Sequence, residues 1–153
     1  MATTRVRLSP SGPRLEGLAI GGALLSSDVD SANAVSVDSE AVVLSFSYVV
    51  TADEDATKLL ILGSYELRGL TDDGIITLRV TIDAGIPAVL QTQSAVPYER
   101  IADEGETGAH GSFFQTYDIP ATAGTYLFEL LGEAENGQMD AYAQFLRFST
   151  PAS

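Results

Sequence analysis

The chain has 153 residues, of which 45% are hydrophobic and 19% charged, and this balance is that of a single globular domain rather than of a disordered chain. The formal net charge is −13, which opposes nucleic-acid binding because that affinity depends on neutralising phosphates with lysine and arginine. The absence of cysteine excludes disulfides and thiolate metal sites, and no apolar run approaches the ~20 residues that span a bilayer. We therefore expect neither nucleic acid nor a membrane as partner.

The charge is unevenly distributed along the chain. Residues 1–15 hold three arginines and no acidic residue, whereas the remainder holds five basic and 21 acidic side chains, which gives −16. Two prolines and a glycine in this stretch predict an extended N-terminal arm. A basic arm on an acidic body is either a frayed terminus or an interaction tail that contacts an acidic surface of another protein. In the second case, the partner-binding residues are Arg5, Val6, Arg7, Leu8 and Arg14.

A short apolar stretch follows the arm. Residues 18–25 read LAIGGALL, and they predict a β-strand or extended segment that covers the domain. From residue 35 onwards the sequence becomes rich in strand patterns. We therefore divide the chain into residues 1–34, the N-terminal arm and covering segment, and residues 35–153, the folded domain.

Alternation of apolar and polar side chains is the main structural signal in the folded domain. A period of two directs one set of side chains to a core and the other set to solvent. The pattern predicts strands at residues 41–51, 58–67, 75–82, 86–92 and 112–119 and two more within 124–149, with no helix. Asp-Gly at 73–74 predicts a hairpin between two of these strands, and residues 94–111 are expected to be a long connection. About eight strands bounded by turns predict an all-β antiparallel β-sandwich of jelly-roll type.

The last two strands are the most strongly patterned part of the chain. Asn136-Gly137 lies between two alternating runs, and both residues tolerate the positive φ of a type I′ turn. Residues 124–149 are therefore predicted to form a β-hairpin whose two strands pair with each other.

Four apolar residues predict an oligomer interface. Phe113 and Phe114 are adjacent in a strand, so one of them must leave the core. Leu127 and Leu131 share a strand face with Glu129, opposite the face that carries the expected core residues. A strand that is apolar on both faces is covered either by another subunit or by another part of this chain.

No residue constellation indicates catalysis. His110 is the only histidine, and it lies in a glycine-rich stretch without a nucleophile-elbow motif, so we expect a non-enzymatic protein without a cofactor. The acidic loop Asp53–Asp55, with Asp28 and Asp30, offers oxygen ligands to Ca²⁺, but consecutive carboxylates cannot all face one ion. A solvated acidic loop is the simpler interpretation, and no metal site is predicted.

One family resemblance covers residues 42–149. The runs KLLILGSYEL…GIITLRVTIDAG and SFFQTYDIPATAGTYLFELLGEAENGQMDAYAQFLRF resemble the small jelly-roll virion proteins of tailed bacteriophages, namely head decoration proteins, head fibres and tail-tip modules. Tumour-necrosis-factor-like trimers have a similar outline. Ala84 stands inside the usual Asp-Gly turn, which leaves the local turn type open.

The resemblance implies a homotrimer in the virion, bound to the major capsid protein or another virion protein. The expected function is that of a capsid decoration protein that stabilises the head from outside. The alternative that the resemblance leaves open is a receptor- or carbohydrate-binding module of a phage tail fibre or tail tip.

Overall fold

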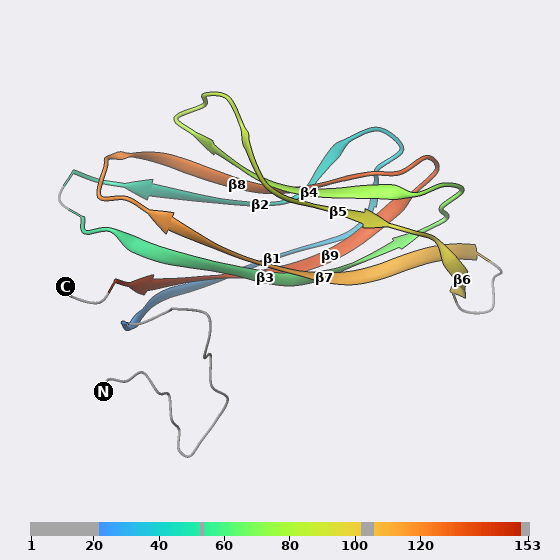
Figure 1. The fold of residues 1–153 in the computed structure, drawn as a ribbon, viewed down its shortest axis with the longest axis horizontal. Helices are drawn as coiled ribbons and strands as arrows, with labels where there is room; N and C mark the ends of the chain where they lie inside the picture. The colour runs from blue at the N-terminus through green and yellow to red at the C-terminus, as the bar shows by residue number, and fades with distance from the viewer. Residues whose placement is uncertain (1–21, 53, 102–105, 151–153) are drawn as a thin grey trace, which may run out of the picture.

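The computed structural model describes residues 22–52, 54–101 and 106–150, and these form nine strands and no helix. Figure 1 shows the strands in two layers, one above the other. The strands are β1 (Leu24–Ser36), β2 (Ala41–Val50), β3 (Thr57–Arg68), β4 (Gly74–Ile82), β5 (Ala88–Ala95), β6 (Tyr98–Ile101), β7 (Glu106–Ile119), β8 (Gly124–Glu133) and β9 (Gln138–Ser149).

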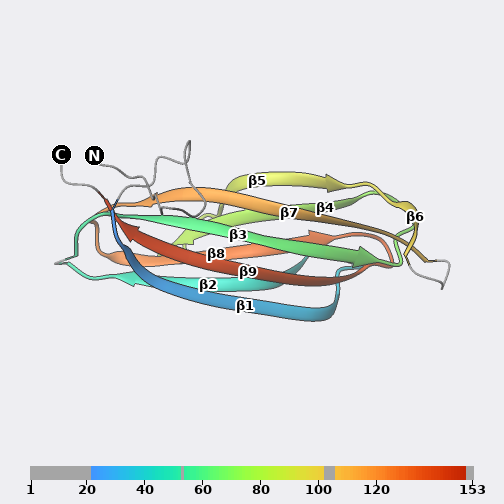
Figure 2. The same ribbon diagram turned by 90° about the horizontal axis from the view of Figure 1, so that it is seen from below.

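The strand order confirms the predicted sandwich and its jelly-roll character. One sheet has five strands in the order β1-β9-β3-β7-β6, and the other has four in the order β2-β8-β4-β5. All neighbouring strands are antiparallel. Apart from β4–β5 and β6–β7, each strand is followed by a strand in the opposite sheet, which is the alternation of a jelly roll. Figure 2 shows β9 lying between β1 and β3 in the five-stranded sheet.

The predicted pairing within residues 124–149 is wrong. β8 pairs with β2 and β4, whereas β9 pairs with β1 and β3 in the other sheet. The connection between β8 and β9 is therefore an arch between the sheets and not a hairpin. The hairpin predicted at residues 73–74 is likewise an arch from β3 to β4. A reversal within one sheet and a reversal between two sheets produce the same alternating pattern, so the sequence does not separate them.

The turn type predicted at Asn136-Gly137 also needs correction. Gly137 donates its N–H to the carbonyl of Ala134 over 2.9 Å, so the central residues of the turn are Glu135 and Asn136. Of these two only Asn136 has a positive φ, 61°, which is the pattern of a type II turn. Gly137 is required for a different reason, because a Cβ there would lie 2.9 Å from the Cβ of Ala134.

A type I′ turn occurs instead between β4 and β5. Asp83 and Ala84 have φ values of 51° and 58°, and Gly85 donates its N–H to the carbonyl of Ile82 over 2.9 Å. Asp83 is held by Thr125 of β8, whose N–H donates to the Asp83 carboxylate over 2.8 Å. Ala84 is exposed and adopts the left-handed conformation without such a contact from its side chain.

Two segments differ from the sequence-based assignment. β1 begins at Leu24 and runs to Ser36, so it contains the boundary drawn after residue 34 and pairs along β9. The expected long connection at residues 94–111 includes the end of β5, all of β6 and the start of β7. The division of the chain into arm and domain remains a prediction, because most of the N-terminal part lies outside the described residues.

The core lies between the sheets and is aromatic at its centre. Phe46 of β2 stacks on Phe145 of β9, with ring centroids 4.7 Å apart, and Tyr117 meets Phe128 edge-on at 5.2 Å. These two pairs join the sheets through contacts worth more than their buried area alone.

Polar side chains line the gap between β5 and β7. Gln91 donates to the carbonyl of Phe114 over 2.8 Å, and Gln93 donates to that of Ser112 over 3.1 Å. At this edge of the sandwich, side-chain hydrogen bonds therefore connect β5 of the four-stranded sheet to β7 of the five-stranded sheet.

Candidate interaction surfaces

The four residues predicted to form one interface are divided between the core and the two outer faces of the sandwich. Phe113 is 4% exposed and belongs to the core, whereas Phe114 is 46% exposed on the outer face of the five-stranded sheet. Leu127 and Leu131 point away from the core on the four-stranded sheet, where Leu127 is half-buried and Leu131 is 3% exposed. One phenylalanine of the pair leaves the core, as predicted. The predicted arm residues 5–14 lie outside the described part of the chain.

The outer face of the four-stranded sheet carries little net charge, and we call it the neutral face. Its centre holds an ion pair, in which Arg79 lies 2.9 Å from Glu129. Strand alternation and register assign to this face Val42, Ser45, Ser47, Val49, Ile75, Thr77, Arg79, Thr81, Val89, Thr92, Ser94, Thr125, Leu127, Glu129, Leu131 and Glu133. Valines at 42, 49 and 89 and isoleucine 75 are 42–62% exposed. The face is thus composed of apolar and hydroxyl groups, with Glu133 as the charged side chain outside the central pair.

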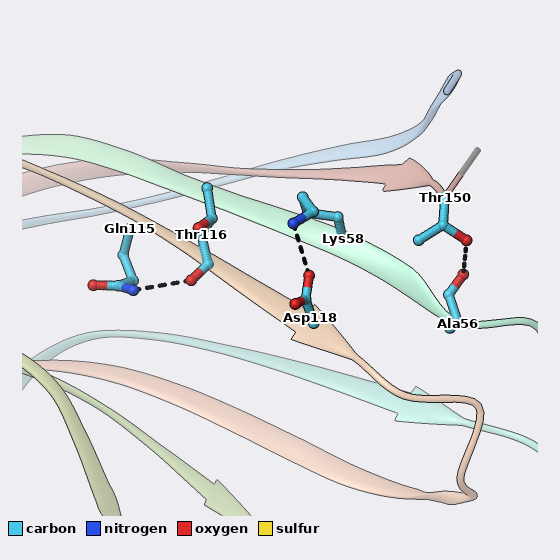
Figure 3. A network of polar contacts seen from close by, with 6 residues as sticks. All are labelled: Ala56, Lys58, Gln115, Thr116, Asp118 and Thr150. Carbon is cyan, nitrogen blue, oxygen red and sulfur yellow. Dashed lines mark hydrogen bonds and ion pairs between the residues drawn. The ribbon is translucent and has the colours of Figure 1, made fainter. Parts of the chain in front are cut away.

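The outer face of the five-stranded sheet has an apolar half and a polar half. The apolar half is formed by Leu60, Leu62, Phe114, Leu146 and Phe148. It is bordered by an ion pair of 2.8 Å between Lys58 of β3 and Asp118 of β7 (Figure 3).

A shallow hollow occupies the polar half of the same face. Its volume is about 300 Å³, and its lining includes Ser64, Glu66, His110, Asp140 and Tyr142. The register places Glu66 of β3 between His110 of β7 and Asp140 of β9. Tyr142 is 44% exposed and offers an aromatic surface beside these polar groups.

Asp140 is the most constrained carboxylate of the hollow. It lies 2.9 Å from Arg68 and accepts a hydrogen bond from the N–H of Ala34. Because this carboxylate is already engaged by a cation and a backbone donor, its arrangement is that of a structural contact between β1, β3 and β9. Sequence reasoning did not find the hollow, since the residues come from three strands and the register between them was unknown.

Two of the acidic residues considered for Ca²⁺ accept hydrogen bonds from other groups in the structure. The carboxylate of Asp30 accepts hydrogen bonds from the N–H groups of Ser31 and Ser45, and Glu54 accepts one from the hydroxyl of Tyr48 over 2.7 Å. Within the described residues, no group of three or more histidine, cysteine, aspartate or glutamate side chains is placed to hold a metal ion. Asp53 lies outside these residues.

Three tyrosines have shifted acidities. Burial raises the pKa of Tyr65 and Tyr117 above the usual 10.0. Burial also raises the pKa of Tyr48, with a further contribution from its hydrogen bond to Glu54. The guanidinium of Arg147 lies over the ring of Tyr48, 4.2 Å from its centroid, and this cation opposes the increase.

Comparisons with known proteins add the following. No protein-family model matches the sequence, and no curated protein matches it either. A solved structure of infectious bursal disease virus, Gx strain, is similar over 85% of this chain and 39% of that chain, with 12% identity and a TM-score of 0.28. This chain therefore spans well under half of that chain's length. Among the described residues, no helix is long and apolar enough to cross a membrane.

Proposed function

We propose that this protein is a non-enzymatic structural component of a virus particle, a homotrimer that binds the outside of the capsid as a decoration protein. The sequence resemblance and the jelly-roll strand order support this proposal. The observation that carries it furthest is the neutral face, which supplies a surface for self-association on a strongly acidic protein.

The charge balance explains why such a face matters. Each copy has a net charge of −13, so two copies repel each other wherever acidic surfaces meet. Protein interfaces are depleted of charged residues at their centre. On the neutral face Arg79 and Glu129 neutralise each other, while exposed valines provide apolar contact area. A closed trimer buries this face on every copy without leaving a free edge.

The oligomer is tested by a matched pair of substitutions. Val49 on the neutral face and Val29 on the five-stranded sheet are 57% and 55% exposed, and both lie on edge strands. Val49→Glu is expected to convert trimers to monomers in light scattering, because it adds a negative charge to each buried contact. Val29→Glu is expected to leave the mass unchanged. A monomeric unmodified protein at micromolar concentration, or a trimeric Val49→Glu variant, contradicts the proposed interface.

Capsid attachment is tested separately with purified shells. Shells that lack the protein should take it up in a fixed ratio that saturates. Failure to bind, with the trimer intact, argues against decoration while leaving self-association in place.

A second function is favoured by the polar hollow. Tyr142 beside Glu66 and His110 offers the stacking surface and polar groups that a sugar ring requires, which fits a carbohydrate-binding module. Titration with host polysaccharide distinguishes the two functions. Saturable binding that Tyr142→Ala abolishes supports the module, whereas its absence leaves decoration as the proposal.

A further inference from the structure

One residue in the apolar half of the five-stranded sheet, Leu60, is more buried than its position explains. Leu60 is 2% exposed, yet it points outward and does not belong to the core cluster between the sheets. The register places it beside Leu146, and Leu62 beside Phe114. In the part of the chain that the structure describes, no strand lies over this side of the sheet (Figure 1).

The chain enters the fold at the edge of this apolar half. Ala23 donates its N–H to the hydroxyl of Ser149 and accepts the N–H of Ser149 at its carbonyl, both over 2.9 Å. Leu24 then pairs with Phe148, a member of the apolar half. Whatever precedes Gly22 therefore starts within one strand spacing of the apolar side chains.

Gly22 changes the direction of the chain at this point. Its φ is 92°, and a Cβ there would meet the carbonyl oxygen of Ser149. This conformation is readily available only to glycine, and it lets the preceding residues turn away from the line of β1. The described structure thus supplies both the position and the turn for a segment that folds back over the sheet.

Residues 15–21, LEGLAIG, have a composition that fits this position. In an extended conformation Leu18 and Ile20 point to the same side, while glycine and alanine alternate with them. Seven extended residues reach ~23 Å, and strands lie ~4.8 Å apart, so the segment is long enough to cross β9, β3 and β7.

We propose that residues 15–21 lie across the apolar half of the five-stranded sheet, with Leu18 and Ile20 against Leu60, Leu62 and Phe148. A segment tethered at Gly22 has an effective concentration in the millimolar range, so it competes well against a second copy for this face. The proposal does not depend on capsid binding. It leaves the arginines of residues 1–14 available for another partner.

Engineered disulfides test the contact directly, because the chain has no cysteine of its own. Two double variants of the full chain are made, Ile20→Cys with Leu62→Cys and Leu18→Cys with Leu62→Cys. Together they allow either Leu18 or Ile20 to be the residue that lies beside Leu62. At least one pair is expected to form an intramolecular disulfide under mild oxidation. The matched control, Ile20→Cys with Val49→Cys on the opposite sheet, is expected to stay reduced. If neither Leu62 pair forms a disulfide, the proposal is overturned. If the Leu62 pairs form disulfides between molecules instead, the proposal is also overturned, and a second copy of the chain is the occupant of this face.

A charge substitution provides a readout that does not depend on disulfide geometry. Leu18→Asp with Ile20→Asp in the full chain is expected to release the segment, so that hydrogen exchange accelerates in residues 58–62 and 144–148 and a hydrophobic dye binds. Ala19→Asp, on the opposite side of the segment, is expected to change neither. Equal exchange in the unmodified chain and the double variant overturns the proposal. Since these assays are run without capsids, their failure is distinguishable from failure of the decoration function.

Discussion

Replacing Ala84 with glycine is expected to stabilise the protein. Ala84 has a φ of 58° in the β4–β5 turn, and the left-handed region costs an L-residue ~1–2 kcal/mol. Glycine removes this cost but adds ~0.5–1 kcal/mol of unfolded-state entropy. The side chain of Ala84 is exposed, so little packing is lost. The net gain is about 0.75 kcal/mol and at most ~1.5 kcal/mol, which corresponds to an increase in Tm of about 1.5–3 °C, and at most ~6 °C, for a chain of this size.

Thermal unfolding followed by circular dichroism measures this effect. Ala88→Gly is the matched control, because Ala88 is also exposed but lies in β5 without a positive φ. It should lower Tm, since glycine in a strand pays the entropy cost without relieving strain. Ala34→Gly, at a φ of 52°, should raise Tm as Ala84→Gly does. If Ala84→Gly lowers Tm as much as Ala88→Gly, the strain argument is refuted.

Three further predictions follow from features described above. Gly137→Val should destabilise by ~2 kcal/mol or more, because its Cβ would lie 2.9 Å from that of Ala134, and an unchanged urea midpoint would contradict this. The free energy of unfolding should be independent of tyrosine ionisation below pH 10 and fall above it. The pKa values of Tyr48, Tyr65 and Tyr117 are raised in the folded protein, so the unfolded chain loses its tyrosine protons first as the pH rises. Tyr65→Phe should reduce this loss of stability at alkaline pH, measured by urea titrations at several pH values. Replacing Arg5, Arg7 and Arg14 together with serine should weaken attachment to capsids at low salt and have less effect at high salt, as measured by co-sedimentation. If the variant binds capsids as well as the unmodified protein does, these arginines do not contribute to attachment.

The positions of most strands could be predicted, but their partners could not. Alternation located residues 41–50 and 75–82 almost to the residue, since a half-buried strand must alternate whatever lies beside it. Partner choice depends on which sheet each turn leads to, and this is decided by the packing of the whole domain. The turn at Asn136 shows the difference, because Gly137 and Ala134 both bond to Val37 in the connection between β1 and β2, a contact that no local pattern contains.

For the candidate surfaces, the sequence likewise predicted which side chains leave the core but not which of them lie on the same face. The Phe113-Phe114 pair required one outward aromatic side chain, and Phe114 is that side chain. Period two did not reveal that Phe114 and Leu127 face opposite sides of the sandwich, because the two strands were not known to belong to different sheets. The hollow around Glu66 depended on the register of β3 with both β7 and β9, and it therefore had no sequence signal.

The last strand, β9, lies inside the five-stranded sheet and not at its edge, and this has a consequence for how the protein is made. β9 lies between β1 and β3, so the five-stranded sheet is divided until the chain has been synthesised through Ser149. Before β9 is synthesised, β1 has no neighbour in its sheet and β3 pairs along one side only, with β7, which leaves open strand edges on the nascent chain. Pairing β1 with β9 joins residues more than a hundred positions apart, and contacts of such separation slow folding. We therefore expect ribosome-bound chains that end before β9 to remain protease-sensitive, and resistance to appear only after the C-terminal strand has left the exit tunnel.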